Sequence, residues 1–117
     1  MQVKEAYTVM KGDYEGVLSR LLNEERIQKY LLKFLNDKSF ETLKAALSEG
    51  NGEEAFRMAH TLKGVSQNLG LSVLFESSNA LTEALRNGIK EDAGPLFEKV
   101  EEDYHMTVSA ISTLQSE

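Results

Sequence analysis

The sequence predicts an all-α protein, an up-and-down antiparallel four-helix bundle with a short extra helix at the N-terminus. A single proline in 117 residues leaves nearly the whole chain free to be helical. Apolar residues recur three and four positions apart, which is the spacing of a helix with one buried face. The glycines lie mostly where this pattern breaks, and the short connections that they mark imply antiparallel neighbours.

The first two helices are expected to begin at residues that can cap them. Asp13 can accept a hydrogen bond from the first turn of a short helix, and Asn23 can do so for a second. The apolar side of the short helix consists of Val17, Leu18, Leu21 and Leu22. The second stripe consists of Ile27, Tyr30, Leu31 and Phe34, and changes phase further on to Phe40, Leu43 and Leu47. Either the helix breaks near Asn36–Ser39, or one long helix turns successive faces to different neighbours, which suits a bundle better.

Three further helices follow, separated by turn residues. The Gly50–Gly52 segment predicts a turn before a third helix over about residues 53–69, which Gly70 can end in a left-handed conformation. Ser72 can cap a fourth helix, which stops at Asn87–Gly88. Its inward residues are Leu74, Ser78, Leu81 and Leu85.

A last helix opens with Pro95 in its first turns, where the missing N–H of proline costs nothing. Its seam alternates three and four positions apart, through Ala93, Phe97, Val100, Tyr104, Thr107, Ile111 and Leu114. We expect one domain over residues 1–117, with the bundle core at about residues 24–115.

Composition excludes several classes of function. The chain is too short for a nucleotide-binding domain with a second lobe and has no phosphate-binding glycine motif, which excludes an autonomous kinase. The net charge of −6 argues against nucleic acid and anionic membranes as partners. Without cysteine there are no disulfides, thiolate metal sites or cysteine nucleophiles. With neither a signal-peptide layout nor an apolar run of spanning length, the expected location is the cytoplasm. The acidic exterior and single seam favour a monomer.

One histidine lies at the centre of a polar helix face. On a wheel of the third helix, the residues expected to be buried fall within an arc of roughly 100° nearly opposite His60. They are Ala55, Met58, Leu62, Val65, Ser66 and Leu69. Around His60 gather Glu53, Phe56, Arg57, Lys63, Gly64 and Gln67. This placement predicts an exposed imidazole and disfavours a buried core histidine.

Gly64 argues against a surface histidine without a role. A glycine inside a helix costs about 1 kcal/mol relative to alanine. Here it lies one turn after His60 on the same face, so it leaves the imidazole uncovered and lets another protein approach. Lys63 places an ammonium group beside whatever the imidazole carries. These features suit the acceptance of a phosphoryl group, although spacing alone leaves the interpretation open.

The stretch from Ala59 to Gly70, AHTLKGVSQNLG, resembles the phosphoacceptor motif of the histidine-containing phosphotransfer (HPt) domain family. The likeness is looser around Phe34, at Ala46–Leu47 and in the spacing from Leu74 to Leu81. The resemblance implies a helical phosphorelay carrier in which His60 accepts and donates a phosphoryl group, by family precedent through Nε2. It also implies receiver domains of response regulators or hybrid histidine kinases as partners. The receiver is expected to supply Mg²⁺, so the chain itself needs no cofactor.

The sequence departs from the family after the motif. Members often carry Leu-Glu on the next helix, where the carboxylate is thought to orient the histidine, whereas this chain has Leu81-Thr82. Glu83 follows one position later, about 100° around the helix. The ring of His60 is therefore held by Thr82, by Gln67 or by water.

Four residues are candidates for docking the receiver: Phe56, Arg57, Gln67 and Asn68. Arg57 is also placed to help Lys63 offset the charge of the phosphate. Phe56 is an apolar side chain on a polar face, which favours a docking role over packing against the second helix. His105 follows Glu101, Glu102 and Asp103, and a solvated acidic face is favoured there over a metal site.

Two other functions remain open. One is a phosphoacceptor domain served in trans by a chemotaxis-type kinase, which ranks lower because the Asn68–Gly70 segment looks more like relay carriers. The other is a helical adaptor that binds a receiver without taking phosphate. The combination of His60, Lys63 and Gly64 argues against the adaptor.

Overall fold

The computed structural model describes residues 2–115, and all regular secondary structure in this range is helical. The helices are α1 (Val3–Met10), α2 (Tyr14–Leu21), α3 (Glu24–Phe34), α4 (Ser39–Glu49), α5 (Gly52–Asn68), α6 (Ser72–Leu85) and α7 (Ala93–Gln115). The prediction of an all-α protein is confirmed.

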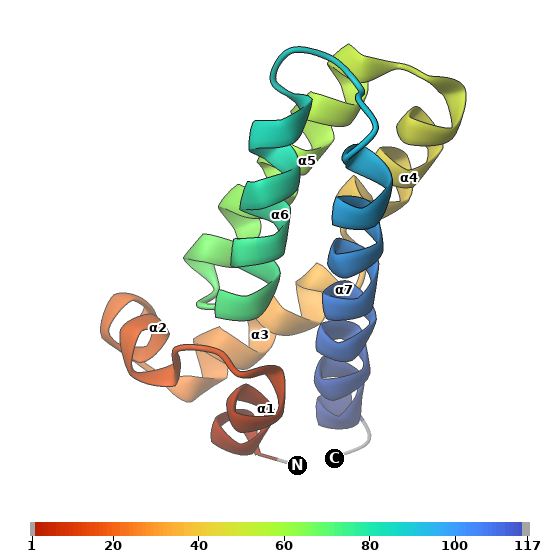
Figure 1. The fold of residues 1–117 in the computed structure, drawn as a ribbon. Coiled ribbons are helices and arrows are strands. Elements are labelled where there is room, and N and C mark those ends of the chain that lie inside the picture. Colours follow the sequence, from red (N-terminus) through yellow and green to blue (C-terminus); the bar gives the residue numbers. More distant parts are fainter. Residues whose placement is uncertain (1, 116–117) are drawn as a thin grey trace.

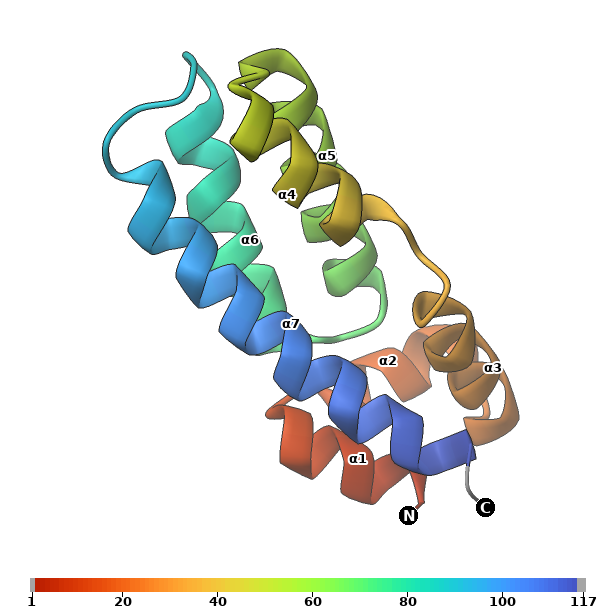
Figure 2. The same cartoon turned by 90° about the vertical axis from the view of Figure 1, so that its right-hand side faces the viewer.

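Helices α4 to α7 lie side by side and alternate in direction along the chain (Figure 1). Helix α5 packs against both α4 and α6, and α6 packs against α7. Helix α7 is the longest, and its C-terminal part extends beyond the other three to contact α1 and α3 (Figure 2). Six of its seven predicted seam residues are buried and Phe97 is half-buried.

Of the two alternatives that the sequence leaves open, the structure has the break near Asn36–Ser39 and not one long helix, because α3 ends at Phe34 and α4 begins at Ser39. After Phe34 the backbone tightens, with Asn36 N–H donating to the carbonyl of Lys33 and Asp37 N–H to that of Phe34, both at 3.0 Å. The Asp37 carboxylate then accepts from Ser39 N–H at 2.8 Å, where α4 begins. The break lets each segment bury its own stripe, although Tyr30 is exposed and Leu47 only half-buried.

Two short helices precede α3, where one was predicted. Asp13 caps α2 and Asn23 caps α3, as expected, with side-chain oxygens that accept from backbone N–H groups three residues on. Leu22 lies outside α2 and is 72% exposed, which contradicts its expected place on the apolar side. Helix α1 was not predicted. It buries one side against the bundle through Val3, Ala6, Tyr7 and Met10.

The turn between α5 and α6 is built by glycine and by the N-terminal segment. Gly70 has φ +66° and closes a Schellman motif, as predicted, with Leu71 N–H donating to the carbonyl of Ser66 at 2.9 Å. Asp13 N–H donates to the Gly70 carbonyl at 2.8 Å, so the chain before α2 lies directly against this turn. Ser72 is not a cap, because it is the first residue of α6 and its side chain makes no capping hydrogen bond.

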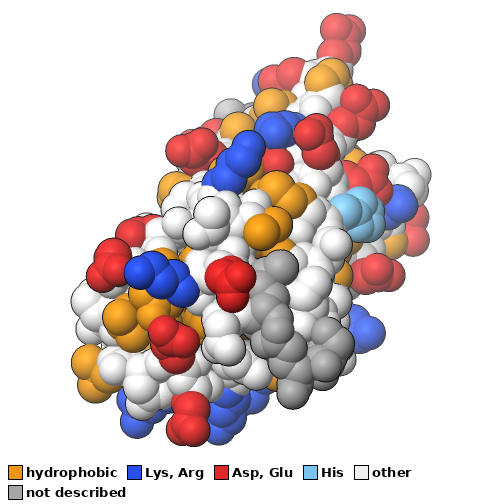
Figure 3. Space-filling view, turned by 90° about the horizontal axis from the view of Figure 1, so that it is seen from below, with side chains coloured by type: hydrophobic (Ala, Val, Ile, Leu, Met, Phe, Trp, Pro, Cys, Tyr) orange, Lys and Arg blue, Asp and Glu red, His pale blue; other side chains and the backbone are white. Residues whose placement is uncertain are grey.

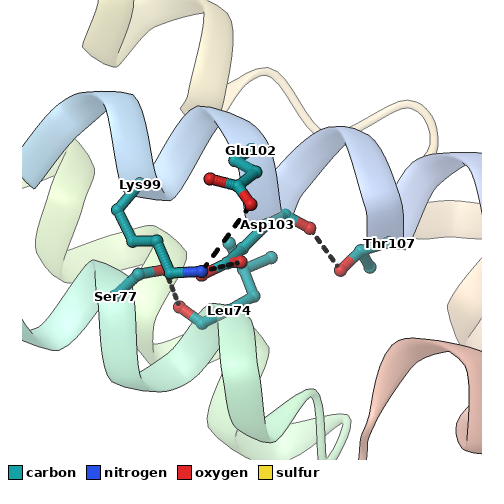
Figure 4. A network of polar contacts seen from close by, with 6 residues as sticks. All are labelled: Leu74, Ser77, Lys99, Glu102, Asp103 and Thr107. Atoms are coloured by element: carbon teal, nitrogen blue, oxygen red, sulfur yellow. Dashed lines mark hydrogen bonds and ion pairs between the residues drawn. The ribbon is translucent and has the colours of Figure 1, made fainter.

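Helix α7 carries a buried carboxylate, which corrects the prediction of a solvated acidic face that includes Asp103. Its side chain is 4% exposed and bonds Lys99 Nζ at 3.1 Å. Figure 4 shows this pair facing Leu74 and Ser77 of α6. Lys99 compensates a charge that burial would otherwise make costly.

Charged side chains of both signs are spread over the face of the molecule that is seen in Figure 3. At the end of the molecule seen in Figure 3, Asp and Glu are interspersed with Lys and Arg, and hydrophobic side chains show between them. The net charge of −6 is therefore not gathered into one acidic region on this face.

Candidate functional site

His60 lies in the middle of α5 and is exposed to solvent, as the helical wheel predicts. Its orientation follows from the residues on the other side of the helix. Ala55, Ala59, Leu62 and Ser66 are fully buried, whereas Met58 and Val65 are only half-buried. Because the buried side is tightly packed, α5 cannot rotate, and the imidazole is held on the outer face.

The end of α6 contributes side chains next to the histidine. The Phe56 ring, half-buried, lies 6.1 Å from the imidazole between ring centroids. The guanidinium of Arg86 lies over the Phe56 ring at 5.3 Å and bonds Glu83 at 2.6 Å. This bond holds the pKa of the Glu83 carboxyl below its usual range, and the charges of Lys63 and His60 act in the same direction. Glu83 therefore lies within electrostatic reach of both.

His60 opens into a shallow hollow of about 520 Å³. Its lining consists of Glu53, Phe56, Arg57, His60, Thr61 and Arg86. Arg57 forms an ion pair with Glu54 on its own helix, with 2.5 Å between nitrogen and oxygen, and its side chain is 67% exposed. The imidazole thus shares an open, water-accessible surface with two guanidinium groups.

Gly64 has no packing role within the described residues. A Cβ atom built at this position would meet nothing within 4 Å, so the chain itself does not require glycine there. The absence of a side chain leaves the surface beside His60 open. Lys63, one residue earlier, is half-buried, and its charge acts to lower the pKa of the Glu83 carboxyl.

Thr82 does not orient the histidine, contrary to one of the expectations from the sequence. Its side chain is fully buried, and its hydroxyl donates to the carbonyl of Ser78 at 2.6 Å. Glu83 instead bonds Arg86, whose guanidinium lies over the Phe56 ring. Sequence reasoning missed Arg86 and set Glu83 aside, although an arginine three positions after a glutamate on one helix signals an ion pair.

Gln67 and Asn68 are exposed at the end of α5, about two turns from His60. Their carbonyls accept hydrogen bonds from Arg20 of α2, at 3.2 and 3.0 Å. The hydroxyl of Tyr7 donates to the next carbonyl, that of Leu69, at 2.6 Å. The N-terminal helices therefore hold the C-terminal end of the histidine helix through its last carbonyls, of which that of Gln67 also accepts from Gly70 N–H at 3.2 Å.

A second hollow, of about 420 Å³, begins at Asn68 and runs between α2, α3 and α5. Phe34, Leu69 and Val65 contribute apolar lining, and Arg20 and Lys33 contribute cations. Of the predicted docking residues, Phe56 and Arg57 thus line the His60 hollow, whereas Asn68 lines this separate one.

Within residues 2–115, no group of three His, Asp or Glu side chains is placed to hold a metal ion. His105 is exposed, lies 3.9 Å from a Glu101 carboxylate oxygen and meets the Phe40 ring edge-on. In the described part of the chain, no helix is long and apolar enough to cross a membrane.

The sequence model of the Hpt domain matches residues 32–112, more than two thirds of the chain. The protein therefore belongs to the Hpt domain family, which carries out histidine phosphotransfer in two-component signalling. Hpt domains interact with receiver domains in general. No curated protein and no solved structure matches the chain significantly. The matched range includes His60 and all of α5, and it leaves α1 and α2 outside.

Proposed function

We propose that this chain is a phosphorelay carrier that accepts a phosphoryl group on His60 from the aspartyl phosphate of one receiver domain and passes it to another. The observation that carries the proposal is an exposed imidazole beside an unfilled position at Gly64. A docked receiver must bring its aspartyl phosphate into line with a ring nitrogen. A side chain one turn away on the same face would hinder that approach.

The transfer is a simple displacement at phosphorus. The neutral imidazole attacks through Nε2 while Nδ1 keeps its proton. The N–P bond forms as the P–O bond to the receiver's aspartate breaks, and the aspartate leaves as a carboxylate with the electron pair. The reverse displacement, by the aspartate of a second receiver, regenerates the neutral imidazole. Such transfer depends mainly on positioning and on compensating charge, since its transition state is loose.

Lys63 is the cation proposed to offset the charge of the phosphoryl group, with Arg57 in a supporting role. Lys63 lies beside His60 on α5, and Arg57 lines the same hollow as the imidazole. Mg²⁺ is proposed to come from the receiver, and no cofactor is assigned to this chain. The proposal places the protein in the cytoplasm as a monomer that docks receivers through Phe56, Arg57, Gln67 and Asn68.

The test is transfer of labelled phosphate from a panel of receivers charged with acetyl phosphate in the presence of Mg²⁺. We expect label that is labile in acid and stable in base on the wild type and on His105→Gln, and none on His60→Gln. The His105 variant is the matched control, because this second exposed histidine lies on α7, outside the hollow. Binding without label from any receiver would overturn the proposal in favour of an adaptor.

A further inference from the structure

The surroundings of His60 hold balanced charge before any phosphate arrives. Three cations and three carboxylates lie on this surface: Lys63, Arg57, Arg86, Glu53, Glu54 and Glu83. Both guanidinium groups are already paired with a glutamate three residues earlier in the chain. A phosphoryl group adds a charge of about −1.5 to −2 to this surface. Unless an existing ion pair changes partner, only Lys63 is free to compensate that charge.

The two pairs differ in where their carboxylates lie. Glu83 is near enough to His60 and Lys63 for their charges to act on it, so a phosphoryl group on His60 would repel this carboxylate. Arg86 follows the last residue of α6 and lies on the Phe56 ring, which in turn lies beside the imidazole. Its side chain is 52% exposed and can turn without disturbing the core.

We propose that Glu83 and Arg86 form an ion-pair switch: Glu83 holds Arg86 in the resting protein, and a phosphoryl group on His60 takes Arg86 from it. The inference rests on the proposed role of His60 as phosphoacceptor. The phosphoryl group is the better partner, since it carries more charge than a carboxylate and offers three acceptor oxygens to a planar guanidinium. The Phe56 ring supports the guanidinium from below in both states.

The two residues of the switch have opposite effects on the stability of phosphorylated His60. Arg86 stabilises phosphorylated His60, whereas Glu83 competes for Arg86 and weakens that stabilisation. Glu83 therefore helps to set how readily His60 passes its phosphoryl group onward. Both are positioning residues that act after transfer, and neither attacks the phosphorus.

The experiment loads phosphate without any receiver. Phosphoramidate, which transfers its phosphoryl group to an imidazole nitrogen and releases ammonia, is applied to the His105→Gln protein, so that His60 is the remaining acceptor. The second pKa of the phosphoryl group, normally about 6, is then followed by ³¹P NMR between about pH 4.5 and about 8. The same measurement is made on Arg86→Gln and Glu83→Gln in that background. The controls are Arg26→Gln and Glu25→Gln, which make the same charge changes at exposed positions on α3.

The switch predicts shifts of opposite sign. Arg86→Gln raises the pKa of the phosphoryl group and Glu83→Gln lowers it, each by about half a unit, while the two controls leave it unchanged. In transfer assays, Arg86→Gln should move the equilibrium about threefold toward the receiver, and Glu83→Gln a similar factor toward His60.

Equal pKa values in all variants would overturn the switch, whatever any receiver does. Shifts of the same sign for both variants would also overturn it, because they would show no competition for Arg86. If the opposite shifts appear but no receiver transfers phosphate, the switch stands and the relay function fails. The two proposals can thus be judged separately.

Discussion

Replacing Gly64 by alanine should stabilise the fold and at the same time slow phosphoryl transfer. The added Cβ meets nothing within 4 Å, so the change carries no steric cost within the described chain. Gly64 lies inside α5, and glycine in a helix interior is less stable than alanine by about 0.5 to 1 kcal/mol. For a chain of this length, that gain corresponds to a rise of about 3 °C in Tm. Urea denaturation and calorimetry measure it directly.

The functional half of the prediction concerns approach of the receiver. The new methyl group, one turn from His60, occupies space into which the receiver's surface must move. We expect single-turnover transfer from a charged receiver to slow by about tenfold in Gly64→Ala, and further in Gly64→Gln. The rate is followed by rapid quench, with the folded fraction checked by circular dichroism.

Gly94 provides the matched control. It lies at the start of α7, it also has open space where a Cβ would be, and no α7 residue lines the His60 hollow. Gly94→Ala should leave the transfer rate unchanged. A Gly64→Gln protein that transfers at the wild-type rate would refute access as the reason for Gly64. A Gly64→Ala protein less stable than wild type would refute the packing argument.

Three further predictions concern the framework of the site. Tyr7→Phe leaves the carbonyl of Leu69, the residue that follows α5, without its buried donor, so the free energy of unfolding should fall by about 1 to 2 kcal/mol, measured by urea denaturation. Lys99→Gln leaves the buried Asp103 carboxylate uncompensated, so it should destabilise the fold more than the same change at the exposed Lys44, in parallel melts. A hydrogen bond to Glu24 raises the pKa of Tyr14 to about 12. The stability that this bond contributes is therefore present below pH 10 and is lost as pH rises toward 12. Ultraviolet titration should show the ionisation of Tyr14 near this pH, and Glu24→Gln should lower the pKa of Tyr14.

The local features of the histidine helix could be predicted from the sequence. The limits of α5, the left-handed Gly70 and the exposure of His60 follow from the residues next to them in the chain. Helical periodicity is a property of consecutive residues, and a glycine cap acts within one turn. The caps at Asp13 and Asn23 could be predicted for the same reason.

Some features left a signal that could have been used. Asp103 lies three positions after Val100 and four before Thr107, which are both on the buried seam of α7. This spacing predicts that Asp103 is buried as well. Lys99, four positions earlier, was the compensating charge. The charge of the acidic run at residues 101–103 suggested that all of its residues are exposed. The position of each residue on the helix, and not its charge, decides which of them is exposed.

The other features of the fold and the site could not be predicted, because they depend on contacts between distant parts of the chain. The chain breaks before α4 because the apolar stripes of α3 and α4 face different neighbours. The spacing of the apolar residues is compatible both with a break and with one long helix, so it could not decide between them. The hydrogen bonds from Tyr7 and Arg20 to the end of α5 join residues 62, 47 and 48 positions apart. Glu83 and Arg86 lie near His60 because α6 packs along α5 in one register. Sequence periodicity predicts which face of a helix is buried, but it does not predict the register of that helix against a neighbour.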